Sequence, residues 1–378
     1  MNSKSLFISV VLSSLFVMGD GATTLQKLPW SEELQEVLDR GLKTSGGTGV
    51  SAAVLVAGTG EWAGVSGISD VKTAECITPE MLFDVASVGK TFTAALALQL
   101  AEEGKLSLDD SLHKWLPDFP HISRTATVRQ LLNHTSGISH FSKNPRYWSA
   151  VFATPDSLWT PLDVLAFVPE PRFPPGGGWH YSSTNYILLG MIIEKATGSA
   201  LSEQLRSRIL IPWRLKNTFP SLDSTASKSR VFAHPHFDLD GDGKLDDMGS
   251  LSRNSLFSSG WAAGPVVSTA EDLTRWAECL YGDHVLQKES LQQMTDFYRP
   301  TPGEPFLSGY GLGTADLTGE LLGGEKVWGH LGWQPGSMTA MLYLPTHSVS
   351  IAVLINDNNE ACITSLVVGL WGVVKKHL

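Results

Sequence analysis

The chain is short of charged residues and of cysteine. Asp, Glu, Lys and Arg make up 17% of its 378 residues, below the roughly 25% of ordinary soluble domains. We therefore expect a polar but sparsely charged surface. Its cysteines, Cys76, Cys279 and Cys362, are too few and too scattered for a disulfide framework or a metal cluster, so at most one bridge can form.

An excess of basic charge is also absent, because 28 Lys and Arg residues face 38 Asp and Glu residues, a net charge of −10. Nucleic acid and anionic membrane surfaces attract proteins through positive charge, so neither is an expected partner. The hydrophobic content of 42% excludes bulk disorder. We find no internal repeat and no low-complexity tract. The composition is that of a globular protein.

The sequence has no hydrophobic run long enough for a relaxed membrane span, which needs roughly 20 residues. An uncharged apolar stretch near the N-terminus runs from Leu6 to Gly19 and follows Lys4. A basic start, a short apolar stretch and small residues after it resemble a secretory signal peptide. An uncleaved anchor or a buried helix is the alternative. We expect residues 1–22 to be a signal peptide and the mature chain, residues 23–378, to be periplasmic or secreted without stable membrane insertion.

Strand patterns occupy both ends of the mature chain, and helical patterns occupy its middle. Turn residues separate each of two strand pairs, which predicts antiparallel hairpins. We therefore expect an α/β (α+β) fold with an antiparallel sheet built from both termini, flanked by the first and last helices, and an inserted helical subdomain. The α/β part would comprise residues 28–88 and 255–378, and the helical part residues 89–254. The segments are strands 50–56, 62–68, 337–344 and 348–355, and helices 30–42, with Ser31 as N-cap, 88–104 and 360–377.

Ser87 and Lys90 stand at the start of the predicted helix 88–104. Residues three apart share a helix face, so the lysine amine can reach the serine hydroxyl. A helix N-terminus also supplies free N–H groups and partial positive charge. The pattern Ser-x-x-Lys occurs by chance in many chains, so an N-cap serine beside an exposed lysine is the alternative.

Two other short motifs place polar groups where a ligand could meet them. Tyr181 follows the proline- and glycine-rich loop 169–178, and His330 is flanked by Gly329 and Gly332 before a predicted strand. Glycines at a strand edge let backbone N–H groups approach a ligand closely. Taken singly, a packed aromatic ring and a turn with a satisfied histidine are the plain alternatives.

In this order and with these separations, the three motifs resemble those of the penicillin-recognising serine hydrolases. This family comprises class C β-lactamases, D-alanyl-D-alanine carboxypeptidases and the related family VIII-type esterases. Residues 131–138 and 267–273 look like its scaffold segments. The resemblance implies a β-lactamase-like fold and a secreted serine hydrolase that acts on a small-molecule or peptide acyl substrate and requires no cofactor.

The family pattern also implies a role for each matching residue. Ser87 would be the nucleophile that becomes acylated, and Lys90 its proton acceptor. Tyr181 would relay the proton to the leaving group, and His330 would give a hydrogen bond and positive or dipolar stabilisation. The oxyanion would lie between the backbone N–H groups of Ser87 and Trp333, where charge develops in the transition state.

Two positions depart from the family pattern. Ser183 stands where the second motif usually has Asn, and Leu331 stands before Gly332 where the third usually has Thr. In β-lactam-active members those side chains help hold the substrate amide and carboxylate; Asn185 could substitute for one of them. We therefore favour an esterase or peptidase over a class C-like β-lactamase. A catalytically silent ligand-binding relative is the alternative from another class.

An acidic segment resembles a calcium loop. Asp238, Asp240, Asp242 and Asp246 fill positions 1, 3, 5 and 9 of such a loop, and a glycine stands at position 6. Position 12 is Gly249 instead of a bidentate Glu, so the ligand set is incomplete. The sequence leaves a structural calcium site and a solvated acidic turn as equal alternatives.

Overall fold

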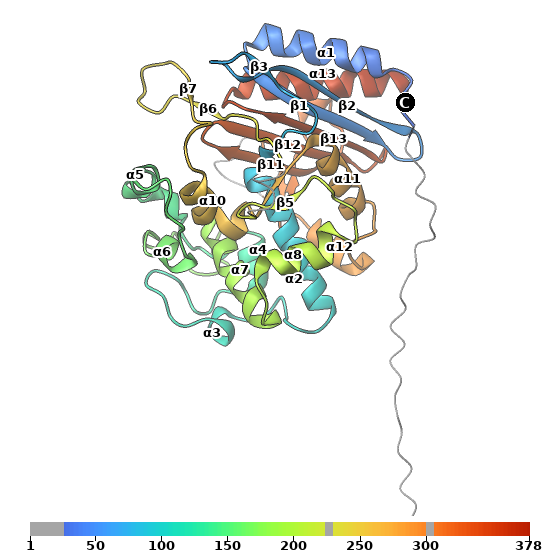
Figure 1. The fold of residues 1–378 in the computed structure, drawn as a ribbon. Coiled ribbons are helices and arrows are strands. Elements are labelled where there is room, and N and C mark those ends of the chain that lie inside the picture. The colour runs from blue at the N-terminus through green and yellow to red at the C-terminus, as the bar shows by residue number, and fades with distance from the viewer. Residues whose placement is uncertain (1–25, 224–229, 300–305) are drawn as a thin grey trace, which may run out of the picture.

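The computed structural model describes residues 26–223, 230–299 and 306–378. The predicted signal peptide, residues 1–22, lies outside them. Within the described residues, eight strands form one antiparallel sheet in the order β3-β2-β1-β13-β12-β11-β10-β9 (Figure 1). The strands are β1 (Gly49–Val56), β2 (Gly60–Asp70), β3 (Glu75–Cys76), β9 (Gly309–Tyr310), β10 (Ala315–Asp316), β11 (Trp328–Gln334), β12 (Ser337–Leu344) and β13 (Val349–Ile355).

The two ends of the chain meet in the middle of this sheet. Strand β1 pairs with β13, with Val50 opposite Ile355 and Ala53 opposite Ala352. All eight residues of β1 are buried, because helices cover both faces, and its nearly continuous apolar sequence suits that position. The antiparallel sheet built from both termini is confirmed.

Helices α1 (Ser31–Ser45) and α13 (Glu360–His377) pack on the outer face of the sheet, at the top of Figure 1. The prediction that Ser31 caps α1 was wrong. Trp30 occupies the N-cap position, and the Ser31 hydroxyl donates a hydrogen bond to the Leu28 carbonyl at 2.5 Å. With its proton directed backwards to Leu28, the hydroxyl makes no capping bond to the helix.

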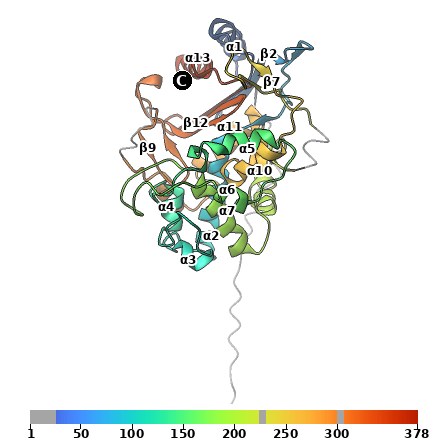
Figure 2. The same ribbon diagram turned by 90° about the vertical axis from the view of Figure 1, so that its left-hand side faces the viewer.

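The inner face of the sheet is covered by α11 (Ala270–Tyr281), and the other helices form a layer beyond it (Figures 1 and 2). Helix α2 (Lys90–Glu102) lies in the centre of that layer and is almost entirely buried, so its sequence is apolar on every side. The remaining helices are α3 (Leu112–Trp115), α4 (Val128–Leu132), α5 (Arg146–Ala153), α6 (Pro161–Leu165), α7 (Thr184–Thr197), α8 (Leu201–Leu205), α10 (Asn254–Gly260) and α12 (Lys288–Met294).

Short strands join these layers. Strands β4 (Phe83–Asp84), β8 (Val266–Ser268) and β5 (Phe219–Pro220) form a small sheet, and β6 (His236–Phe237) pairs with β7 (Asp246–Asp247). The mixed α/β class is thus confirmed. None of the helices in the described part of the chain combines the length and the hydropathy needed to cross a membrane.

Candidate active site

Ser87 lies in a 3-10 turn, η1 (Ala86–Gly89), that leads directly into α2. The residue before it, Ala86, has a φ of 46°, a left-handed conformation that costs energy for any residue with a Cβ. Its N–H donates to Asp84 Oδ1 at 2.8 Å. Burial raises the pKa of Asp84 to about 6. The anchored turn presents Ser87 to the cavity described below instead of placing it inside the α-helix.

The Lys90 amine is fully buried beside that serine. Lys90 Nζ donates to Ser87 Oγ at 2.8 Å and to the Ala263 carbonyl at 3.0 Å. Burial lowers the pKa of Lys90 to about 7, because a low-dielectric environment disfavours the charged amine. A large fraction of the enzyme therefore holds a neutral lysine amine near pH 7, which is the form that can accept a proton from the serine.

Tyr181 lies against the same amine and is supported by a buried histidine that sequence reasoning missed. The Tyr181 ring centroid is 5.1 Å from Lys90 Nζ and 4.4 Å from the centre of the His134 ring. His134 Nδ1 lies 3.2 Å from the Ser182 N–H nitrogen, which donates to it, and 3.1 Å from Asn185 Nδ2. In the sequence alone, residues 131–138 look like scaffold. The signal that could have identified this support is His134, a polar residue between two leucines and a Thr-Ser-Gly segment.

His330 is neutral in this environment. Its Nδ1 lies 2.6 Å from the Leu331 carbonyl, which fixes the proton there, and its Nε2 accepts from the Tyr310 hydroxyl at 2.8 Å. Burial, reinforced by the nearby Lys90 charge, lowers the pKa of His330 to about 3. A neutral His330 ring is consistent with the dipolar one of the two contributions expected from it.

Gly332 is required by the close approach of β11 to the serine turn. A Cβ at this position would lie 2.3 Å from the Val85 carbonyl oxygen. Next to it, the Trp333 side chain is 47% exposed, and its ring lies 6.5 Å from Trp148 and 6.3 Å from Phe237. Strand β11 thus brings its backbone against the segment that carries Ser87.

The structure does not bring Ser183 into the cavity. Ser183 is 7% exposed at the N-cap position of α7 and makes no capping bond. Asn185 is fully buried, and its Oδ1 accepts from Ser136 Oγ at 2.7 Å, so it is engaged in the support of His134 and does not replace the missing asparagine. Leu331, in contrast, is 38% exposed and lines the cavity.

A cavity of about 580 Å³ opens at Ser87. This volume lies within the range of about 300–1,000 Å³ that small-molecule sites occupy. Tyr181, Tyr310, His330 and Trp333 line it near the serine, and most of the remaining lining is apolar. The predicted catalytic residues Ser87, Lys90, Tyr181 and His330 therefore come together at one end of a ligand-sized cavity.

The acidic loop gathers only part of its predicted ligands. Oxygen atoms of Asp238, Asp240 and Asp242 lie within 4.8 Å of one another, whereas Asp246 is not in that group. Asp246 lies in β7, and its Oδ2 accepts from the Leu239 N–H at 3.1 Å. Pairing in the β6–β7 hairpin holds this fourth carboxylate apart from the other three.

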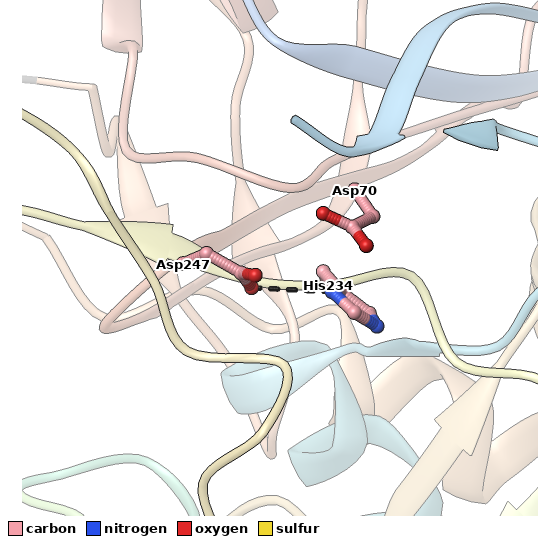
Figure 3. Close-up of side chains that lie close together, drawn as sticks. All are labelled: Asp70, His234 and Asp247. Carbon is pink, nitrogen blue, oxygen red and sulfur yellow. Dashed lines mark hydrogen bonds and ion pairs between the residues drawn. The ribbon is translucent and has the colours of Figure 1, made fainter. Parts of the chain in front are cut away.

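A second group of potential ligands, Asp70, His234 and Asp247, lies beside the same hairpin (Figure 3). His234 Nδ1 and Asp247 Oδ1 are 3.1 Å apart, and Lys72 Nζ lies 3.5 Å from the second Asp247 oxygen. Asp70 accepts from the Lys72 N–H at 2.7 Å and from the Thr73 hydroxyl at 2.7 Å. The group ties the end of β2 to β7 through ion pairs and turn hydrogen bonds.

The fold and its solved neighbours place the chain among the serine hydrolases that share the β-lactamase fold. The family model described as Beta-lactamase matches residues 34–362, so the chain belongs to the β-lactamase family. Similar curated proteins include a penicillin-binding protein of Bacillus subtilis, 28% identical over 78% of this chain, and Protein flp of Staphylococcus aureus, 27% identical over 78%. The chain spans 65% and 56% of their respective lengths.

Solved structures match nearly the whole chain. The D-amino acid amidase of Ochrobactrum anthropi SV3 has a TM-score of 0.79 and 27% identity, and the alignment covers 92% of this chain and 99% of that one. A D-stereospecific amidohydrolase of a Streptomyces species has a TM-score of 0.74 and 29% identity, with 88% and 97% covered. The expected β-lactamase-like fold is confirmed.

The buried amine leads to a prediction about pH. If neutral Lys90 accepts the serine proton, kcat/KM for an aryl ester should rise with pH through about 7, the value to which burial lowers the pKa of this lysine. Lys90→Ala should lower kcat by about 10²- to 10⁴-fold and abolish that rise. Lys43→Ala, on the exposed side of α1, is the matched control. A pH profile unchanged in Lys90→Ala would remove Lys90 from the mechanism.

The acidic loop leads to a conditional prediction. If Asp238, Asp240 and Asp242 bind calcium, the incomplete ligand set should give weak affinity, on the order of 10⁻⁴ to 10⁻³ M. Thermal melts in millimolar calcium and in chelator should then differ, and Asp240→Ala should abolish the difference. If the unaltered protein melts at the same temperature in calcium and in chelator, the solvated acidic turn is the remaining interpretation of this segment.

Proposed function

We propose that the chain is a secreted hydrolase that cleaves esters and peptide bonds of D-residues through an acyl-enzyme on Ser87. The observation that carries this proposal is the buried pair in which Lys90 Nζ lies 2.8 Å from Ser87 Oγ. An amine whose pKa is lowered to about 7 and a serine that opens into a cavity serve nucleophilic catalysis. The intact pair argues against a catalytically silent relative. Export rests on the apolar segment after Lys4.

In the first step, Ser87 Oγ attacks the acyl carbon while its proton passes to neutral Lys90. The new C–O bond converts the carbonyl to a tetrahedral oxyanion, which the N–H groups of Ser87 and Trp333 stabilise. Such donors are most effective where the negative charge develops. Gly332 permits this arrangement, because any side chain there would push β11 away from Val85.

Collapse of the tetrahedral intermediate breaks the bond to the leaving group. Lys90 returns the proton, and the Tyr181 hydroxyl relays it to the departing alkoxide or amine. Tyr181 is a neighbour of the amine, with 5.1 Å between Lys90 Nζ and the ring centroid. Water then attacks the acyl-enzyme by the reverse sequence of proton transfers and regenerates Ser87.

The groups that surround Ser87 favour esters over β-lactams. A β-lactam presents an amide and a carboxylate, and a site without partners for them discriminates poorly in their favour. Leu331 offers no hydroxyl, and Ser183 is buried outside the cavity. The similarity to a D-amino acid amidase and to a D-stereospecific amidohydrolase supports D-configured amides as the second substrate class.

Labelling tests the nucleophile. A fluorophosphonate probe should add its mass to the peptide that contains Ser87, and Ser87→Ala should abolish the addition. Tyr181→Phe should keep the fold and lower kcat by about 10²- to 10⁴-fold, since it removes a proton-transfer step. Undiminished labelling of Ser87→Ala would refute the assignment.

The absence of Asn at position 183 and of Thr at position 331 predicts which substrates are hydrolysed faster. Short-chain aryl esters should be hydrolysed, and β-lactam turnover should be slower by about two decades, a gap of about 2.7 kcal/mol in transition-state stabilisation. The double variant Ser183→Asn with Leu331→Thr should narrow that gap. Equal kcat/KM values for a cephalosporin and an aryl ester would instead favour the class C-like β-lactamase.

A further inference from the structure

The cavity at Ser87 continues around an open strand edge. Strand β10 pairs with β11 only at Ala315–Gly329 and Asp316–Trp328. In the described part of the chain, the edge of β11 from His330 to Gln334 therefore has no strand partner on that side. Because one continuous cavity contains both Ser87 and residues of the outer face, a ligand bound at Ser87 can extend past Gly332 to the other side of the sheet.

Beyond that edge the cavity is lined by apolar side chains under α13. We call this part the outer groove. Leu331 of β11 and alternate residues of β12 form its floor, one face of α13 forms one wall, and the segment around η5 (Glu320–Leu322) forms the other. Its members are Leu331, Met338, Ala340, Leu342, Leu321, Leu322, Ile363, Thr364 and Val367.

The exposed leucines of the outer groove point to an apolar occupant. Leu321 is 48% exposed and Leu331 is 38% exposed, although both line a cavity that is continuous with the active site. A ligand that covers these two leucines would remove apolar surface from water, which is favourable. On α13 the cavity is also lined by Glu360 and Thr364. The Glu360 carboxylate disfavours an anionic occupant, and the remaining groove side chains are apolar.

Tyr181 and the groove residues line the same cavity. This cavity includes Tyr181 and Tyr310 but not Trp148 or Phe237, which flank Trp333. In the proposed mechanism Tyr181 delivers the proton to the leaving group, so the part of the substrate beside Tyr181 is the alcohol or amine. The acyl part extends toward the other side.

We infer that the outer groove binds the leaving group and selects substrates whose alcohol or amine carries an apolar chain. This inference rests on the proposed function, because it needs an ester or amide placed at Ser87. Each buried methylene should raise kcat/KM by up to about fourfold until the chain exceeds the groove, since burial stabilises the transition state by about 0.8 kcal/mol per methylene at most.

A series of n-alkyl acetates tests the inference. Methyl, butyl, hexyl and octyl acetate share one acyl group and nearly the same chemical reactivity, so differences in kcat/KM report the binding of the alcohol chain. Acetic acid release is measured by pH-stat. We expect kcat/KM to rise along the series by at least tenfold. A parallel series of methyl esters, from acetate to octanoate, varies the acyl chain instead and should rise less.

Two adjacent residues of α13 provide a matched pair of variants. Thr364 is partly exposed and lines the groove, whereas Ser365 is exposed and does not line it. Thr364→Asp places a charge in the groove and should cut the octyl-to-methyl ratio of kcat/KM by at least fivefold. Ser365→Asp adds the same charge to the same helix and should keep the ratio. Leu321→Asp is the second groove variant if Thr364→Asp does not fold.

The outcomes separate this inference from the proposed function. A flat alkyl acetate series, or no turnover at any length, together with intact hydrolysis of an aryl ester, overturns the groove but not the Ser87 mechanism. A rise confined to the acyl series overturns the assignment to the leaving group. Equal octyl-to-methyl ratios of kcat/KM in Thr364→Asp and Ser365→Asp would also contradict the assignment of the groove to the leaving group. Absence of Ser87 labelling and of all ester hydrolysis would instead refute the proposed function.

Discussion

The arrangement of the molecule depends on one constraint, which is that the Lys90 amine must be kept away from water. A lysine amine in water has a pKa near 10.4 and is almost always charged at neutral pH. Here α11 packs against α2 through the stacked rings of Phe92 and Trp276, α7 and α8 also pack against α2, and burial lowers the pKa of Lys90 to about 7. Because the Ala263 carbonyl accepts a hydrogen bond from the amine, burial leaves it oriented toward Ser87.

The second determinant is the contact between strand β11 and the serine turn, which come from opposite ends of the chain. Gly332 lies so close to Val85 that no side chain fits between them. Among the described residues, the same strand has no strand partner along one edge beyond Gly329. Under the proposed mechanism, this single strand therefore sets both the catalytic geometry at Ser87 and the access of the substrate to the apolar surface under α13.

The sequence was sufficient to predict the features that depend on local residue spacing. It was not sufficient for the features that depend on tertiary contacts. The helical spacing of Ser87 and Lys90 predicted that the two side chains would meet. The strand patterns at both ends of the chain predicted the antiparallel sheet. The neutral state of His330 depends on burial and on Tyr310, which no spacing reveals. Ser31 suited an N-cap by type, but its hydroxyl bonds to Leu28. The outer groove joins Leu331 with Thr364, residues that only the folded sheet and α13 bring together.

The pairing of β1 with β13 has a consequence for how the chain reaches its active state. Val50 and Ile355 become neighbours only after nearly the whole polypeptide has been synthesised, and contacts of such long sequence separation form slowly because a large loop must close first. Until then the turn that carries Ser87 lacks strands β11 and β12, which pack against it in the folded protein. The Ser87 site is therefore complete only after the last strands of the sheet have been synthesised and have folded.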